Sequence, residues 1–196
     1  MSSVRQAKRR DELVAALRRV AGKRGIAGAN VRAVAAEAEV STGSVLYYFE
    51  SFDRLIFAAV EGVLEEFFED RKRISERIVD PVERMRALIA AGVPDEISDD
   101  LRLVYESIAL AREYPHVAAL HRSIIERQEM LFRATIEVGA ALGAFRPRMP
   151  IGSIARNIVA LEDSYDLYPL IGLAHDRESA RRAVLDYAGL ALDVEL

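Results

Sequence analysis

The spacing of apolar residues constrains the fold of this chain more than any other feature of its sequence. Nearly every stretch places apolar side chains three or four residues apart, which is the period of an α-helix, and no window alternates convincingly with the period of two typical of a strand. Proline divides this pattern at Pro81, Pro94, Pro115, Pro147 and Pro150, because proline breaks a helix interior but suits a first turn. The sequence therefore predicts an all-α protein of about nine helices.

Capping residues place several helix starts. Asn30 can cap a short helix that begins at Val31, Ser41 can cap Thr42–Phe49, and Ser51 can cap a long helix that continues to about Arg77. In the remainder of the chain we expect helices at about 81–92, 98–114, 116–142, 151–172 and 177–192.

Composition excludes several classes of protein. The 196 residues include no cysteine, so neither a disulfide framework nor a thiolate metal site is possible. No apolar run reaches the roughly 18 residues that a membrane span needs. The first residues lack the hydrophobic core of a signal peptide. We expect a cytoplasmic protein.

Charge is unevenly distributed along the chain. The first 55 residues carry ten Lys and Arg against six Asp and Glu, whereas the rest carry 17 against 25. A basic N-terminal quarter on an acidic body indicates a polyanionic partner that binds at one end.

The first 50 residues have the features of a helix-turn-helix. Ala35 and Ala38 are small enough to let two helices approach closely, and the segment after Ser41 carries short hydroxyl and tyrosine side chains. Such groups can bind phosphates and base edges when a helix enters the major groove of DNA.

The stretch from Gly25 to Leu55 closely resembles the TetR/AcrR family of transcriptional regulators. The matching positions, identical or closely substituted, are Asn30, Arg32, Val34, Ala35, Ala38, Val40, Ser41, Gly43, Ser44, Tyr48, Phe49, Ser51, Asp53 and Leu55. The resemblance implies a helix-turn-helix DNA-binding domain over residues 1–50 and a larger helical domain for ligand binding and dimerisation over 51–196. It also implies a regulator without enzymatic activity or cofactor: a repressor that binds a palindromic double-stranded DNA operator as a homodimer and that an unknown small-molecule effector releases.

The resemblance assigns DNA contacts to Arg32, Thr42, Gly43, Ser44, Tyr47 and Tyr48. Three residues depart from the family pattern. Leu46 stands where many members have a phosphate-contacting tyrosine, and Phe52 replaces a lysine that commonly contacts phosphate. Glu39 occupies a turn position that is usually glycine, where a positive φ is costly for a residue with a Cβ atom.

The C-terminal domain is expected to hold the effector and the dimer contacts. Mixed apolar and polar positions on its central helices predict a ligand site at Leu64, Phe67, Leu88, Tyr105, Ile108, Arg112, Met130, Asn157 and Leu161. The last two helices are apolar on more than one face, which indicates burial on more than one side. We predict a dimer interface at Ile158, Tyr165, Val184, Tyr187 and Ala191.

Two alternatives remain open. A di-metal helical bundle would need two Glu-x-x-His pairs, but Glu113 and His116 form one such string and Pro115 interrupts it, so we expect no metal site. The second alternative is a helical sensor that acts through a protein partner without specific operator binding. The departures at Leu46 and Phe52 favour this second alternative, because both remove phosphate contacts.

Overall fold

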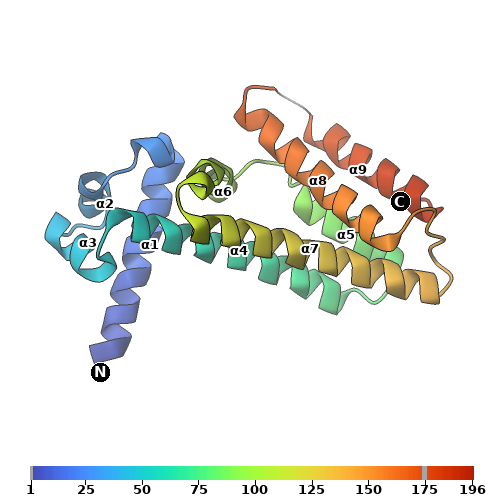
Figure 1. Ribbon diagram of the computed structural model, residues 1–196, viewed down its shortest axis with the longest axis horizontal. Coiled ribbons are helices and arrows are strands. Elements are labelled where there is room, and N and C mark those ends of the chain that lie inside the picture. Colours follow the sequence, from blue (N-terminus) through green and yellow to red (C-terminus); the bar gives the residue numbers. More distant parts are fainter. Residues whose placement is uncertain (1, 174–175) are drawn as a thin grey trace. The chain divides into compact units, whose positions relative to one another are not determined.

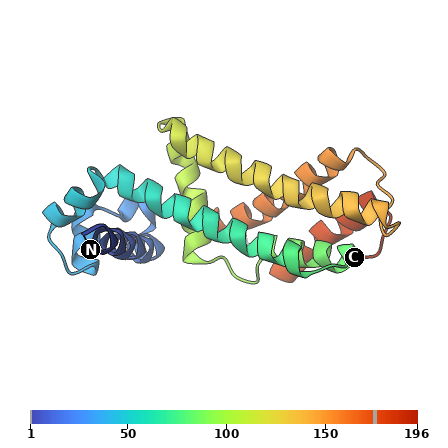
Figure 2. The ribbon, with the colours of Figure 1, turned by 90° about the horizontal axis from the view of Figure 1, so that it is seen from below.

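The computed structural model describes residues 2–173 and 176–196, and every regular element in these ranges is helical (Figures 1 and 2). The predictions of an all-α fold and of nine helices are confirmed for the described residues. None of the described helices is both long and apolar enough to cross a membrane. The α-helices are α1 (Ser2–Gly28), α2 (Val31–Glu37), α3 (Thr42–Phe49), α4 (Phe52–Arg77), α5 (Pro81–Gly92), α6 (Asp99–Ser107), α7 (Pro115–Ala141), α8 (Ile151–Leu170) and α9 (Arg177–Leu192).

Three predicted caps form as the sequence indicates. The Asn30 side chain accepts a hydrogen bond from the Ala33 amide at 3.0 Å, and Ser41 Oγ accepts one from the Ser44 amide at 3.1 Å. Ser51 Oγ accepts from the amide of Arg54 at 3.2 Å. Each cap satisfies an amide that the first helical turn leaves without a partner.

The predicted helix at 98–114 is shorter in the structure. Its α-helical part, α6, ends at Ser107, and residues Ile108–Arg112 form a 3₁₀ turn before α7 begins at Pro115. Ser107 Oγ donates to the Val104 carbonyl at 2.7 Å, and the chain tightens directly after it, as helices commonly do at their ends.

One compact unit comprises the described residues up to Glu65 together with Ser98–His121. Within it, α1 packs against α2, α3 and α6. Leu13, Leu17, Val34, Val45 and Phe49 form the core of this unit and are at most 2% exposed. The three N-terminal helices thus pack around a small apolar centre of their own.

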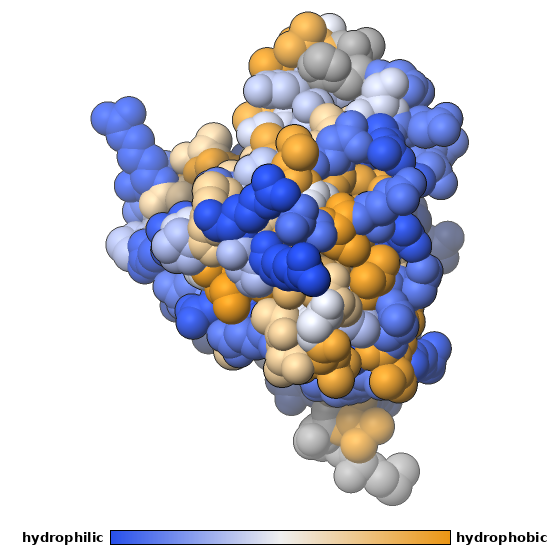
Figure 3. Space-filling view, turned by 90° about the vertical axis from the view of Figure 1, so that its right-hand side faces the viewer, coloured by the Kyte–Doolittle hydropathy of each residue, from blue (hydrophilic) through white to orange (hydrophobic). Residues whose placement is uncertain are grey.

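The second compact unit comprises Glu66–Ile97 and the described residues from Arg122 to Leu196. In it α8 and α9 run antiparallel, and α5 packs against both (Figure 1). Its core includes Met85, Leu88, Phe132, Ile136 and Ile158, all fully buried. Apolar and charged side chains are interleaved on the face of the molecule seen in Figure 3.

The two units do not follow a division at residue 50, because the first half of α4 and all of α6 belong to the unit that contains the N-terminal helices. The functional division into residues 1–50 and 51–196 stays a prediction.

Candidate functional site

Helices α2 and α3 are joined by a tight turn and share one apolar side. Val34 and Ala35 of α2 and Val45 and Phe49 of α3 are at most 3% exposed, so these faces fix the two helices against the core. The turn between them passes through Glu39 at a φ of 54°, the left-handed conformation that the sequence predicts to be costly there. The opposite side of α3 is exposed.

The exposed side of α3 gathers most of the residues predicted to contact DNA. Tyr47 is 76% exposed and Leu46 42%, whereas Ser44 and Tyr48 are half-buried. Thr42 and Gly43 are exposed on α3, and Arg32 is exposed on α2. The structure therefore brings the six predicted residues onto two consecutive helices of one unit.

Gly43 has no structural reason to be glycine. A Cβ atom built at this position would meet no closer neighbour than Ser41 Oγ, at 3.8 Å, which is an ordinary contact. A glycine that the fold does not require, on an exposed helix face, leaves room for another molecule to approach the backbone closely.

Arg10 of α1 positions the end of α3, a role that sequence reasoning missed. Its guanidinium donates to the Tyr48 carbonyl and lies 4.2 Å from the centre of the Phe49 ring. Tyr47 and Tyr48 also contact each other edge-to-face, with ring centres 5.2 Å apart. Only the basic character of Arg10 is visible in the sequence, because its target lies 38 residues away.

Helix α1 is held to its neighbours by charged groups. Arg19 and Lys23 contact Glu37 of α2 at 2.7 and 3.4 Å, and these hydrogen bonds hold the pKa of Glu37 below its ordinary value. Arg18 makes a two-pronged contact with Asp100 of α6, at 2.8 and 2.6 Å.

A second link between α1 and α6 depends on Gly25. This residue has a φ of 70° and kinks α1, which turns the amide of Ile26 toward Glu106 Oε2 at 2.6 Å. A Cβ atom at Gly25 would lie 3.1 Å from that carboxylate. Glu106 of α6 therefore binds the C-terminal part of α1 directly.

The nine predicted ligand residues are spread over both units. Leu64 and Leu88 are buried, and Phe67, Tyr105 and Leu161 are half-buried. Ile108, Arg112, Met130 and Asn157 are exposed, and their role in ligand binding stays a prediction. Ile108 and Arg112 lie in the 3₁₀ turn rather than on a central helix, and Asn157 donates to the Tyr187 hydroxyl at 2.8 Å.

Sequence reasoning missed a buried contact between an arginine and a glutamate in the second unit. Arg71 of α4 donates through Nη2 to both carboxylate oxygens of Glu162 on α8, at 2.9 and 3.1 Å, and to the Leu88 carbonyl at 3.2 Å. The side chains of Arg71 and Glu162 are 7% and 3% exposed. Arg71 Nε is buried without a hydrogen-bond partner.

The pair sits in an apolar surrounding. The Arg71 guanidinium lies 5.1 Å from the centre of the Phe132 ring. Burial raises the pKa of Glu162 to about 8, although Arg71 opposes the shift. A Cβ atom at Gly92 would lie only 2.2 Å from the carboxylate, so the close approach of α5 to α8 needs a glycine.

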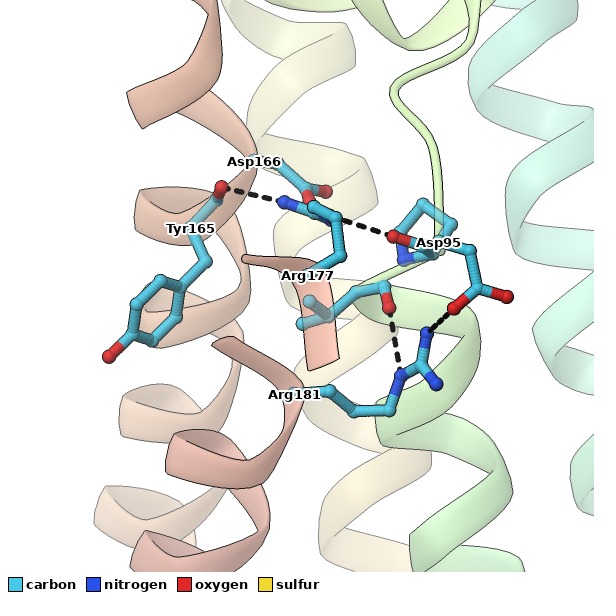
Figure 4. Close-up of polar contacts among 7 residues, drawn as sticks. Asp95, Tyr165, Asp166, Arg177 and Arg181 are labelled. Carbon is cyan, nitrogen blue, oxygen red and sulfur yellow. Dashed lines mark hydrogen bonds and ion pairs between the residues drawn. The ribbon is translucent and has the colours of Figure 1, made fainter. Parts of the chain in front are cut away.

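A second, half-buried arginine joins three segments of the same unit (Figure 4). Arg177 donates to the Pro94 carbonyl and the Tyr165 carbonyl, each at 2.8 Å, and to Asp166 at 2.5 Å. The Tyr165 carbonyl is free to accept because Pro169, four residues later, has no amide hydrogen. Burial raises the pKa of Asp166 to about 6 against the effect of Arg177.

Arg181, one turn after Arg177 on α9, extends this contact. It donates to the Val93 carbonyl at 3.1 Å and to Asp95 at 2.5 Å. Two arginines of α9 thus hold the segment that follows α5 and leads into α6, as Figure 4 shows.

Three of the five predicted dimer residues are corrected by their burial. Ile158 and Val184 are fully buried and Ala191 is 5% exposed, so these side chains pack in the core of their own subunit. Tyr165 and Tyr187 are half-buried. The sequence pattern correctly identified these positions as apolar, but residues of the subunit's own core were predicted to contact a partner subunit.

The outward faces of α8 and α9 carry other apolar side chains. Leu167 is 40% exposed and Leu190 is 74% exposed.

The histidines of the first unit have ordinary packing partners. The His116 ring contacts the Phe57 ring edge-to-face with centres 4.0 Å apart, and His121 Nε2 lies 2.9 Å from Ser107 Oγ. Among the described residues no three His, Cys, Asp or Glu side chains are grouped to hold a metal ion.

Residues 13–59 match the family described as bacterial regulatory proteins, tetR family. The HTH-type transcriptional regulator BetI of Paraburkholderia xenovorans is 29% identical over 188 residues, which cover 94% of this chain and 93% of that protein. The structure of a TetR transcription regulator from Haloarcula marismortui has a TM-score of 0.87 at 22% identity, covering 95% of this chain and 99% of that one. A transcriptional regulator from Saccharomonospora viridis, solved in complex with choline, has a TM-score of 0.86 at 19% identity, covering 95% and 98%. At these identities the two structures show a shared fold.

Proposed function

Because the chain belongs to the TetR family of bacterial regulatory proteins and is a transcriptional regulator with a DNA-binding helix-turn-helix, we propose that it is a repressor. In this proposal it binds a palindromic operator as a homodimer in the cytoplasm, and a small-molecule effector releases it. The observation that carries the proposal is the free face of α3, which lies opposite the buried Val45 and Phe49.

Each of the six predicted residues has a proposed role in DNA binding. Thr42 and Gly43, at the start of α3, approach the base edges, as the first residues of a recognition helix do. Ser44, Tyr47 and Tyr48 contact the sugar–phosphate backbone or groove wall, and Arg32 of α2 contacts a phosphate.

The proposed dimer forms through the outward faces of α8 and α9. Exposed Leu167 and Leu190, together with half-buried Tyr165 and Tyr187, offer apolar surface that a second copy can cover. A two-fold arrangement matches the symmetry of a palindromic operator, whose half-sites lie about 34–36 Å apart.

The proposed effector site lies in the second unit, around the buried pair Arg71 and Glu162. The unpartnered Arg71 Nε can donate to an acceptor atom of a small molecule, and Leu88, Phe67 and Leu161 remain candidates for apolar contacts. Choline, which the regulator of Saccharomonospora viridis binds, is the first compound to test.

The effector signal has a proposed route along the chain to α6. A ligand that shifts α8 or α9 disturbs the hold of Arg177 and Arg181 on the carbonyls of Val93 and Pro94. The chain continues from there into α6, whose Asp100 and Glu106 bind α1. Helix α1 packs against α3, so the position of the DNA-binding face responds to α6.

Operator binding by the full chain tests the proposal. DNA from upstream of the gene is screened by fluorescence anisotropy, and the salt dependence of the affinity is measured on the bound fragment. A specific repressor binds one site with an affinity about 10³-fold or more above that for scrambled DNA, and the affinity falls steeply with salt.

The decisive variant is Gly43→Ala. Its Cβ atom fits the fold, so thermal stability is retained or slightly increased, whereas binding to the operator is lost because the backbone no longer approaches DNA. Gly62→Ala on α4, the same substitution at a glycine with no neighbour within 4 Å, is the matched control and should bind normally. Normal operator binding by Gly43→Ala would refute the proposed contact face.

A second candidate function is a sensor that acts through a protein partner without specific operator binding. Leu46 and Phe52 favour it, because both replace side chains that commonly contact phosphate in the family. Sequence-blind DNA binding by the wild-type protein, with no protected site, would support this alternative.

A further inference from the structure

An exposed leucine lies in the middle of the DNA-facing side of α3. Leu46 is 42% exposed, although its neighbour Val45 is fully buried. Leu46 follows Thr42 by four residues and Gly43 by three, so the three side chains share one strip of the helix surface. The strip therefore combines a hydroxyl, an open backbone and an aliphatic group.

The rest of α3 gives Leu46 no packing role in the core. Val45 and Phe49 fill the apolar interior, and Ser44 and Tyr48 border it as half-buried residues. Truncating Leu46 therefore costs the fold little, since leucine and alanine have similar helix propensities and the side chain is 42% exposed.

The chemistry of the major groove offers one apolar partner. Guanine, cytosine and adenine present hydrogen-bond donors and acceptors there, whereas thymine also presents its C5-methyl group. A leucine side chain cannot donate or accept a hydrogen bond, so it discriminates only by contact with that methyl group or by excluding a polar edge.

We infer that Leu46 is a specificity-determining residue that contacts a thymine methyl group in each operator half-site. The inference rests on the proposed operator binding and adds the base that this position reads. Replacing the family's common tyrosine with leucine exchanges a phosphate contact, which is independent of sequence, for an apolar contact that depends on it.

Removal of single methyl groups from the DNA tests the inference. In the operator found by the screen above, each thymine of one half-site is replaced by deoxyuridine, which lacks only the C5-methyl group, first alone and then together with its symmetry mate. At one of these positions, replacement in a single half-site should lower the affinity of the wild-type protein about fourfold, which is the equivalent of about 0.8 kcal/mol for one buried methyl group. Replacement in both half-sites should then lower it by about tenfold or more.

Two variants show whether Leu46 is responsible. Leu46→Ala should bind the thymine operator more weakly and should no longer distinguish thymine from deoxyuridine at that position. Its salt dependence should match that of the wild type, because no charge is removed. Arg32→Ala should bind all DNA more weakly, with a smaller salt slope, and should keep the full sensitivity to the methyl group.

The outcomes separate this inference from the proposed function. Specific operator binding without sensitivity to any thymine methyl group overturns the role of Leu46 and leaves the repressor assignment intact. Sensitivity that persists in Leu46→Ala also overturns it, because another side chain then makes the contact. Failure to find any specific site refutes the proposed function itself.

Discussion

The turn between α2 and α3 allows a direct test of how its geometry affects stability. The Val40 amide donates to the Ala35 carbonyl at 2.9 Å, and the Glu39 amide donates to the Ala36 carbonyl at 3.3 Å. These two bonds form a Schellman motif, in which the residue after the C-cap adopts the left-handed conformation, here Glu39 with a φ of 54°. Glycine normally occupies this position because it has no Cβ atom.

Replacing Glu39 with glycine should stabilise the protein. A non-glycine residue in the left-handed conformation destabilises the folded state by about 1–2 kcal/mol, and glycine removes this strain. Glycine also makes the unfolded chain more flexible, which offsets about 0.4–1 kcal/mol of that gain. The expected net gain is about 0.5–1 kcal/mol. For a chain of this size, the gain corresponds to an increase in Tm of about 1–4 °C.

The assay is thermal unfolding of the full chain, followed by circular dichroism. Glu39→Ala is the matched control, since it removes the same exposed carboxylate but keeps the Cβ atom. We expect its stability to stay within about 0.5 kcal/mol of the wild type. If the glycine variant proves no more stable than the alanine variant, the strain argument is wrong.

Three further predictions concern the second unit and its contacts. Gly92→Ala should destabilise the protein by about 1–3 kcal/mol, since its Cβ atom collides with the carboxylate of Glu162. The control Gly62→Ala, whose Cβ atom meets nothing within 4 Å, should be neutral or stabilising by up to about 1 kcal/mol. Equal free energies of unfolding for the two variants in urea would contradict this prediction. Arg177→Ala should lower the free energy of unfolding by about 3–5 kcal/mol, because it leaves a buried carboxylate and two carbonyls without a donor. Arg182→Ala, which breaks an exposed pair, should lower it by at most about 1 kcal/mol in the same assay. Because the pKa of Glu162 is raised to about 8, this residue keeps a proton in the folded protein that it releases in the unfolded chain. Its contribution to stability therefore falls as pH rises from about 4.5 to 8, by at most about 1.4 kcal/mol per pH unit. Glu162→Gln cannot titrate, so its stability relative to the wild type should rise across that pH range. A fall in its relative stability would show that the paired arginine keeps the carboxylate ionised.

Local signals in the sequence were sufficient for most helix starts. Asn30, Ser41 and Ser51 each cap the helix that the pattern predicts, because a cap depends only on a side chain and an amide three residues later. The strained turn at Glu39 was also predictable, since a known turn position carried an unsuitable residue.

Features that depend on tertiary packing were not predictable in the same way. Periodicity shows that Ile158 and Val184 face apolar surroundings, but it does not distinguish their own core from a partner subunit. Arg71 and Glu162 are 91 residues apart, and in the sequence each looks like an ordinary charged residue on an exposed helix face.

The central claim is that two copies of α3 are presented together to one face of a DNA duplex. A hydroxyl-radical footprint of the full chain on its upstream DNA measures this directly. We predict two protected half-sites, related by two-fold symmetry and centred about 34–36 Å apart, that disappear together in Gly43→Ala. A single protected patch, or uniform protection along the whole fragment, would contradict the claim.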